Sequence, residues 1–389
     1  MNRRDLLLAR GPAAERLAGR DVLVCVFLRG GADGLSLVPP YADPHYRALR
    51  PSLAVGAPGT AGGAIDLDGY FGLHPALAPL EPLYRSGQLA IVQAVGATQV
   101  DRSHFSAQSL MERAVNADSS LRTGWLGRHL QLDAGGQRSL RGVAIQSAVD
   151  QALLGALDAV AIADGANFAL RSRYGAAWIS GLEQLSTDGD SFYALAAEAT
   201  LRTEREFRER GIFTLPPGNG AVYPSSLFGV RMRQAAQYIK SGIGVEAICV
   251  NVEGWDTHAG QNPVLARNLR DLAEGLAAFA TDLGAGMAEV SLLTMSEFGR
   301  RADENASGGT DHGSGNVMLA LGGGVRGGRI YGQWPTLAPA MLDAGALAIT
   351  TDYRSVLLDL LAQRTGNAQA ANLFPGFSAS ALPGLFTAR

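Results

Sequence analysis

Five short segments place carboxylates, imidazoles or a serine directly after apolar runs or at the start of a predicted helix. Four of them are Asp33, Ser103-His104, Asp256-Thr257-His258 and Glu297. The fifth, Asp311-His312, follows a glycine-rich loop and precedes another apolar run. Carboxylate oxygens and imidazole nitrogens are the ligands that Zn²⁺, Mn²⁺, Mg²⁺ and Ca²⁺ take in proteins. We therefore predict a divalent metal site, with the candidate ligands Asp33, Asp256, His258, Glu297, Asp311 and His312.

Three of these residues also have a structural explanation that the sequence leaves open. Asp33 lies in Gly-Gly-Ala-Asp-Gly, and aspartate is common in tight turns because its side chain bonds its own backbone. Ser103 occupies the position of a helix cap. Glu297 precedes Arg300 by three residues and would be explained equally well by an ion pair with it.

Two acid–imidazole pairs favour the metal site most. Asp256 and His258 form a short polar segment after a buried strand, where neither side chain has an evident structural task. Asp311-His312 lies between glycines in the same way. His45 and His129 lie outside these segments and are expected to be surface or core residues.

Mainly apolar runs predict the strands that position these residues. The four main runs cover residues 21–28, 89–95, 246–252 and 288–295. Runs of this length and composition are typical of strands buried on both faces of a parallel sheet. Because ligands bind at the carboxyl ends of strands in open α/β sheets, the candidate residues should gather at that edge. Further strands are expected over 316–321 and near 329–331.

Helical patterns alternate with the strands. They cover residues 74–86, 103–115, 123–132, 174–187, 190–211, 225–241, 262–283 and 352–363. The region 150–240 is mainly helical and is interpreted as a cover over the sheet. The predicted fold class is α/β, a three-layer αβα sandwich with a mostly parallel sheet and a helical insertion. Residues 21–389 are expected to form one domain.

Composition excludes several functional classes. The 389 residues carry a net charge of −3, which gives no electrostatic reason to bind nucleic acid. No apolar stretch reaches the ~18 residues of a membrane span, so no membrane partner is expected. Cys25 and Cys249 lie in apolar runs and are expected to be inert core residues. Gly30-Gly31-x-x-Gly34 lacks the G-x-G-x-x-G spacing, Gly322-Gly323-Gly324 is interpreted as a turn, and no P-loop occurs. No nucleotide cofactor is therefore predicted.

Residues 1–20 are interpreted as a polar arm or short helix. Arg3-Arg4 is similar to the start of a twin-arginine export signal, but only Leu6-Leu7-Leu8 follows before Arg10. An export signal needs an apolar region of roughly 7–15 residues. The arm is therefore interpreted as the remnant of such a signal. A cytoplasmic location is favoured, with export to the periplasm as the alternative.

Seven motifs together resemble one bacterial family, that of domain of unknown function 1501. They are Leu28-Arg-Gly-Gly-Ala-Asp-Gly-Leu35, Leu73-His-Pro-Ala-Leu77, Arg102-Ser-His-Phe-x-Ala-Gln108, Trp255-Asp-Thr-His258, Ser296-Glu-Phe-Gly-Arg300, Thr310-Asp-His-Gly313 and Thr350-Thr-Asp-Tyr-Arg354. The resemblance covers residues 21–385. That family is described as related to the alkaline phosphatase and sulfatase superfamily, so the resemblance implies an alkaline-phosphatase-like fold.

The resemblance also implies roles for the matching residues. Ser103 resembles the superfamily's nucleophile, at the start of its helix. The residues that resemble metal ligands are Asp33, Asp256, His258, Glu297 and His312. Glu297-Phe298 replaces an expected Asp-His, so one histidine ligand of a second ion is missing, and one or two ions are expected. His104 would supply a ligand or a proton, and Arg102 and Arg300 would neutralise charge on the substrate.

These roles predict a metal-dependent hydrolase that attacks a small anionic substrate, a phosphate or sulfate ester, with Ser103. One alternative is a non-catalytic binding or accessory protein, which the missing histidine at Phe298 favours. Another is a non-hydrolytic metal-dependent transferase or mutase. A protein partner remains open. A Ser-His-Asp hydrolase is disfavoured because the sequence has no G-x-S-x-G motif.

Overall fold

The structure is a computed structural model that describes residues 21–98, 101–132, 140–165, 176–187, 191–378 and 383–389. A mixed β-sheet runs through the molecule. Its strands are β1 (Val22–Leu28), β4 (Leu89–Gly96), β5 (Gly142–Ala144), β6 (Ala159–Ala161), β7 (Ala247–Val252), β8 (Val290–Met295), β9 (Asn316–Gly322), β10 (Ile330–Tyr331) and β11 (Thr351–Asp352). Their order is β10-β4-β9-β8-β1-β7-β5-β6, with β11 also paired to β4. Two short strands, β2 (Ile65–Asp66) and β3 (Gly72–Leu73), pair separately.

The sheet is largely parallel, as predicted. β1 pairs in parallel with both β7 and β8, and β5 pairs in parallel with β6 and β7. β9 is the exception, because it runs antiparallel to β4 and β8. Consequently the segment that leads into β9 lies at the same edge as the ends of β1, β7 and β8.

The strands form because their side chains alternate between two buried cores. In β1, Val22, Val24, Val26 and Leu28 pack on one face. Leu23, Cys25 and Phe27 pack on the other. All seven residues are buried, as expected of a central strand with helices on both sides.

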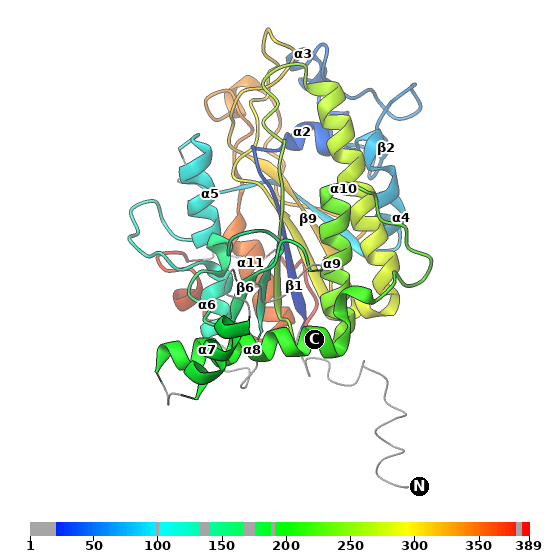
Figure 1. Ribbon diagram of the computed structural model, residues 1–389. Helices are drawn as coiled ribbons and strands as arrows, with labels where there is room; N and C mark the ends of the chain where they lie inside the picture. The colour runs from blue at the N-terminus through cyan, green and yellow to red at the C-terminus, as the bar shows by residue number, and fades with distance from the viewer. Residues whose placement is uncertain (1–20, 99–100, 133–139, 166–175, 188–190, 379–382) are drawn as a thin grey trace.

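Helices cover both faces of the sheet. The longer ones are α5 (His104–Arg113), α6 (Trp125–Leu132), α7 (Ala176–Ser186), α8 (Phe192–Arg210), α9 (Leu227–Ser241), α10 (Gln261–Leu283) and α11 (Tyr353–Arg364). The short ones are α2 (Gly34–Leu37), α3 (Tyr46–Leu49), α4 (Glu81–Arg85) and α12 (Ala370–Leu373). α9 and α10 cover one face, while α5, α6 and α11 cover the other (Figure 1). The predicted three-layer sandwich is therefore confirmed.

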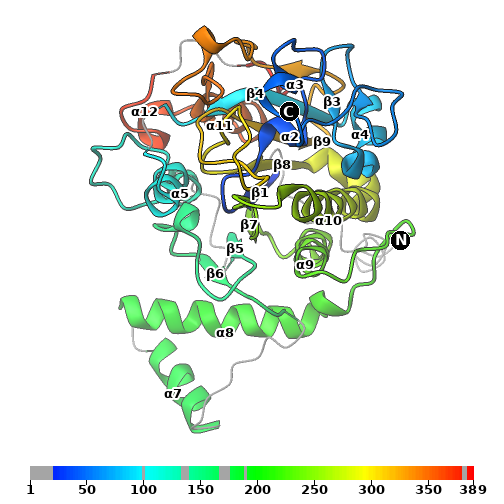
Figure 2. The same ribbon diagram turned by 90° about the horizontal axis from the view of Figure 1, so that it is seen from above.

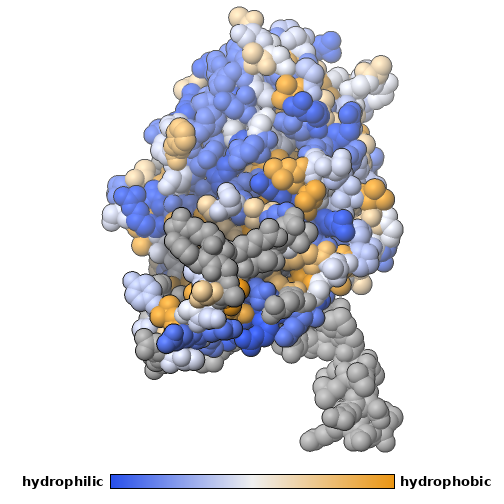
Figure 3. Space-filling view, in the orientation of Figure 1, coloured by the Kyte–Doolittle hydropathy of each residue, from blue (hydrophilic) through white to orange (hydrophobic). Residues whose placement is uncertain are grey.

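The middle region is helical, as expected. Seen from above, α8 crosses beyond β6 and α7 projects from it (Figure 2). Whether the region 150–240 acts as a cover remains a prediction. The face drawn in Figure 3 mixes hydrophilic and apolar residues without one continuous apolar belt.

One expected element differs in detail. The helix predicted over 74–86 starts as a 3-10 segment, Pro75–Leu80, and becomes α-helical only in α4. Pro79 lies inside that segment and has no N–H to donate, which accounts for the irregular turn. The expected arm, residues 1–20, lies outside the described residues. Within the described part of the chain, no helix is long and apolar enough to cross a membrane.

Candidate metal centre

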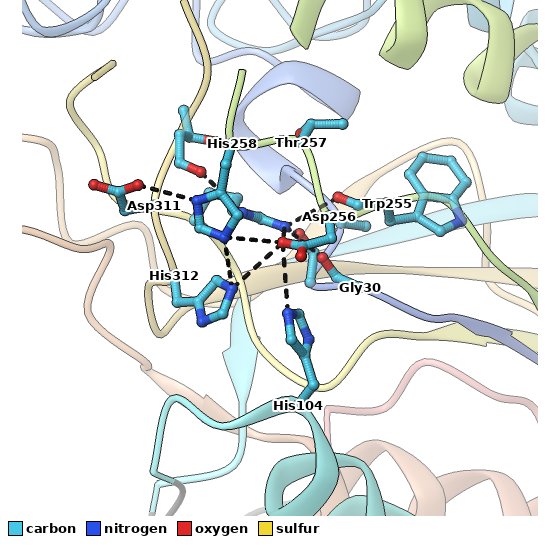
Figure 4. Close-up of polar contacts among 12 residues, drawn as sticks. Gly30, His104, Trp255, Asp256, Thr257, His258, Asp311 and His312 are labelled. Atoms are coloured by element: carbon cyan, nitrogen blue, oxygen red, sulfur yellow. Dashed lines mark hydrogen bonds and ion pairs between the residues drawn. The ribbon is translucent and has the colours of Figure 1, made fainter. Parts of the chain in front are cut away.

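Three histidines surround the carboxylate of Asp256 at one edge of the sheet (Figure 4). From Asp256 Oδ1, the Nε2 atoms of His258, His312 and His104 lie 3.0, 3.4 and 3.5 Å away. Ligand atoms of His104, Asp256 and His312 all lie within 4.8 Å of one another. We call these four residues the Asp256 cluster.

Three loops bring the cluster together. His104 is the first residue of α5. Asp256 and His258 lie in the loop between β7 and α10, and His312 lies in the loop before β9. The antiparallel direction of β9 brings His312 to the edge where β7 ends. The predicted convergence at the sheet edge is therefore present for these residues.

Each imidazole directs its Nδ1 to an oxygen outside the cluster. The pairs are His104 Nδ1 with Glu297 Oε1 at 2.8 Å, His258 Nδ1 with Asp311 Oδ1 at 3.0 Å, and His312 Nδ1 with the Arg102 carbonyl at 2.8 Å. Carboxylates and carbonyls only accept hydrogen bonds, so each Nδ1 carries the hydrogen. In a neutral ring the Nε2 atom then presents a lone pair.

These lone pairs converge. The Nε2 atoms of His258 and His312 lie 2.9 Å apart, so a proton or a cation is needed between them. His104 Nε2 is buried and has no hydrogen-bond partner among the described residues. Metal-binding histidines characteristically donate Nδ1–H to a carboxylate or carbonyl in this way. The donor set of His104, Asp256 and His312 therefore fits a divalent ion, and His258 lies beside it in contact with Asp256 and His312.

The charges at the cluster favour the ligand forms of its residues. Burial would raise the pKa of Asp256, but the hydrogen bond and charge of Arg300 outweigh it and lower that pKa. The Arg300 Nη2 atom lies 2.7 Å from Asp256 Oδ1. Burial lowers the pKa of His312, against the opposing effect of the Arg102 carbonyl. At neutral pH, Asp256 is therefore ionised and His312 carries no extra proton.

Arg300 also holds the surrounding loops in place. Its side chain is fully buried and donates to the carbonyls of Gly30, Gly31, Trp255 and Thr310. These carbonyls belong to the loops after β1 and β7 and to the loop before β9. Arg300 therefore holds these loops together and also pairs with the charge of Asp256.

Glu297 adjoins the cluster as an acceptor. Its Oε1 atom receives hydrogen bonds from the Gly30 amide, Gln108 Nε2 and His104 Nδ1, each at 2.8 Å. Three donors on one oxygen fix its position and, through it, the ring of His104. The structure therefore places Glu297 behind a candidate ligand, and Asp311 stands in the same relation to His258.

Asp33 lies apart from the cluster. It is fully buried, and both its oxygens bind Arg50, with Nη1 at 2.6 Å and Nη2 at 3.0 Å. Ser36 and Gln261 donate to it as well. Burial would raise the pKa of Asp33, but Arg50 and these hydrogen bonds lower it. The structure thus gives the expected ligand Asp33 a buried ion pair and does not bring it to the Asp256 cluster.

Ser103 precedes α5 at the capping position but forms no cap hydrogen bond with its side chain. It is exposed and adjoins His104 in the chain. The neighbouring Arg102 donates from Nη2 to Ser314 Oγ at 3.3 Å and to the Asp343 carbonyl at 3.4 Å. The structure therefore brings Arg102 to the cluster through its backbone carbonyl, which binds His312.

Phe298 packs against two rings of the cluster. Its ring centroid lies 5.0 Å from that of His104 and 4.7 Å from that of His312. The side chain is buried. An apolar ring therefore occupies the space beside the ligands where the resemblance leads one to expect another imidazole.

Two residues that bond predicted ligands, Gln108 to Glu297 and Arg50 to Asp33, were not singled out from the sequence. Gln108 follows His104 by four residues, a spacing that puts both on one face of α5. That spacing was a usable signal. Arg50 lies in a separate short segment after Asp33, and nothing in the local pattern connects the two.

The comparisons with known proteins place the chain in a family. The chain belongs to the family described as "Protein of unknown function (DUF1501)", which matches it over residues 20–360. A search of curated proteins finds no match.

Among solved structures, the chain shows a distant likeness to two crystal structures of Ps i-CgsB, one in complex with k-i-k-neocarrahexaose. Each is 9% identical, with a TM-score of 0.40, over 92% of this chain and 74% of that one. At this TM-score the likeness carries no argument about the present chain.

Proposed function

We propose that the Asp256 cluster binds one divalent ion and that the chain is a metal-dependent hydrolase of phosphate or sulfate esters. The observation that supports this most is the convergence of three Nε2 atoms on Asp256, each ring held by its Nδ1–H. Three imidazoles favour Zn²⁺, Mn²⁺ or a similar transition metal over Mg²⁺ and Ca²⁺, which prefer oxygen ligands. When bound, such an ion supplies Lewis-acid polarisation of a substrate oxygen.

The charge balance supports an anionic substrate. Arg300 already neutralises Asp256, and the three imidazoles are neutral in their ligand form. A divalent ion at this cluster therefore keeps most of its positive charge for a further, anionic partner. In this proposal the Arg102 guanidinium, which bonds Ser314 and the Asp343 carbonyl in the structure, turns towards the ion to assist in holding that anion.

Ser103 is the proposed nucleophile. Its hydroxyl is not committed to capping α5, and the residue is exposed beside His104. A serine hydroxyl is a weak nucleophile at neutral pH and needs activation by a base or a metal. Its place next to a candidate ligand supports that role.

One observation favours a second candidate function, a non-catalytic binding protein with a structural metal. Four protein ligands complete a tetrahedral zinc site, whereas catalytic zinc sites keep one position open. If all four residues of the Asp256 cluster bind a tetrahedral ion, no position is left for substrate.

The first test is the metal content of the purified protein. We expect about one ion per chain in the wild type and none in the Asp256→Ala/His312→Ala variant, with His45→Ala as the matched control. Far-UV circular dichroism checks that each variant folds. If the wild type binds none of Zn²⁺, Mn²⁺, Mg²⁺ or Ca²⁺, the proposed metal centre is wrong.

The second test separates catalysis from a structural role. Cobalt-substituted protein with an open position should change its visible spectrum when phosphate or sulfate is added, and aryl phosphates or sulfates should be turned over. Loss of turnover in Ser103→Ala with normal metal content would support the nucleophile. A closed cobalt spectrum without turnover would favour the binding protein.

A further inference from the structure

A small cavity lies between β1, β7 and the helices α5 and α6. It is lined by Cys25, Phe27, Glu112, Trp125, Asp150, Ala152, Cys249, Asn251 and Met295. Every one of these residues is buried. The volume of the cavity is about 10 Å³.

Two polar atoms of the lining have no hydrogen-bond partner among the described residues. They are Trp125 Nε1, which only donates, and Asp150 Oδ2, which accepts when the carboxyl is ionised. The two residues are 2% and 3% exposed. A buried polar atom without a partner costs about 1–3 kcal/mol. A partner that both accepts and donates would satisfy the two at once.

The other oxygen of Asp150 belongs to a charged network. Asp150 Oδ1 accepts from Arg29 Nη2 at 3.2 Å and from Asn251 Nδ2 at 2.8 Å. Arg29 also binds both oxygens of Glu112, each at 3.0 Å. One guanidinium thus faces two buried carboxyl groups. Burial raises the pKa of Asp150 and of Glu112, although Arg29 opposes the shift.

We propose that this cavity binds one ordered water molecule, which accepts from Trp125 Nε1 and bonds Asp150 Oδ2. A buried water needs roughly 10–15 Å³ of such space and two to four polar partners, and the cavity offers both. Water also suits either protonation state of Asp150, because it donates to a carboxylate and accepts from a carboxylic acid. This site is separate from the Asp256 cluster and does not depend on the proposed hydrolase activity.

Two other occupants fit the lining less well. A monovalent cation would lie against the Trp125 N–H and near Arg29, and both present positive charge to it. A soft metal ion would need thiolates at Cys25 and Cys249. Burial, with the charge of Asp150 next, raises the pKa of both thiols and keeps them protonated.

The water would support a chain of hydrogen bonds that leads from Arg29 to the Asp256 cluster. Arg29 Nη1 donates to Gln108 Oε1 at 3.2 Å, and Gln108 Nε2 donates to Glu297. Glu297 in turn orients His104. By holding Asp150 in place against Arg29, the water supports the first member of this chain.

The test is a crystal structure of the full chain at a resolution that shows single waters, with a second crystal soaked in Rb⁺. We expect one peak about 2.7–3.2 Å from both Trp125 Nε1 and Asp150 Oδ2, without anomalous signal from Rb⁺. The absence of a peak overturns the proposal. A peak that binds Rb⁺ also overturns it, in favour of a cation.

Trp125→Phe removes the indole N–H and keeps an aromatic ring. We expect the peak to disappear or move, and the thermal unfolding midpoint to fall below that of the control Trp178→Phe, which alters a partly exposed tryptophan of α7. A peak unchanged in place and occupancy would contradict the role of Trp125. If this variant does not fold, Asp150→Asn, which has the same size, should fold and retain the water.

Discussion

The Asp256 cluster depends on which nitrogen of each imidazole carries hydrogen. Three acceptors of different kinds, Glu297, Asp311 and the Arg102 carbonyl, hold the three Nδ1–H groups. Each acceptor orients only one ring, but together the three leave all three Nε2 atoms facing the carboxylate of Asp256. At the residue scale, the acceptors behind the candidate ligands therefore determine how the imidazoles are oriented.

Glu297→Gln tests this second layer. A neutral amide accepts a weaker hydrogen bond from His104 and can also turn its own N–H₂ towards it. We expect metal affinity to fall about 10–100-fold, which is the usual effect of losing such a partner. Competition with a chelator of known affinity measures the change.

The control for Glu297→Gln is Glu81→Gln, which alters an exposed pair with Arg85 on α4. It should leave metal affinity as in the wild type. An unchanged affinity in Glu297→Gln would mean that His104 does not bind the ion.

His74 makes stability depend on pH. Burial lowers its pKa from 6.5 to about 4, despite the nearby charge of Asp33. The unfolded chain therefore binds a proton between these pH values that the folded protein does not. Stability should fall as pH drops through 6.5 and level off near 4, a loss of ~3 kcal/mol. Urea unfolding of metal-free protein at pH 7.5 and 4.5 measures it.

His74→Asn is the matched variant for this prediction. His74 Nδ1 accepts from the Ala76 amide, and asparagine can make the same cap without titrating. The variant should lose less stability between the two pH values than the wild type does. Equal losses would assign the pH dependence to other groups.

At the scale of elements, the site depends on how closely the loops pack at the sheet edge. Gly30, the second residue after β1, has φ +120°, and a Cβ there would lie 2.5 Å from the Asp256 amide. Such a contact is backbone against backbone and cannot be relieved by a side-chain rotation. The loop after β1 must therefore carry glycine for the loop after β7 to place Asp256.

Gly30→Ala should displace Asp256 as well as destabilise the fold. We expect metal binding to be lost and unfolding to become easier by more than the ~1 kcal/mol expected for positive φ alone. Gly69→Ala is the control, because Gly69 has φ +85° with nothing within 4 Å of a Cβ. If both variants bind metal normally, the close approach at Gly30 does not position the site.

The elements themselves were largely predictable, and the reason is visible in particular strands. β1 is an unbroken apolar run and β8 is mainly apolar, because both faces of each strand are buried, and such runs are local signals. The convergence of Asp256, His258 and His312 followed from the shared edge. The partner of Asp33 did not follow, because a turn aspartate and a buried ion pair have the same local sequence.

At the scale of the whole molecule, one buried polar network connects segments far apart in the chain. Arg50 binds Asp33 and donates to the carbonyls of Arg301 and Ala302. Gln261, at the start of α10, also bonds Asp33. The ion pair of Asp33 and Arg50 thus connects four segments. They are the loop after β1, the region of α3, the start of α10 and the loop before β9.

Arg50→Met should therefore destabilise the whole fold. Burial would raise the pKa of Asp33, but the charge and hydrogen bonds of Arg50 outweigh it and lower that pKa; without them, the buried carboxyl loses its cation and burial raises the pKa, so keeping it buried becomes costly. We expect a loss of about 3–5 kcal/mol in urea unfolding. The double variant Asp33→Asn/Arg50→Met should lose less than the sum of the two single variants, because no uncompensated charge remains. Additive losses would mean that the two side chains stabilise the fold independently, and the network would then be no more than a set of separate contacts.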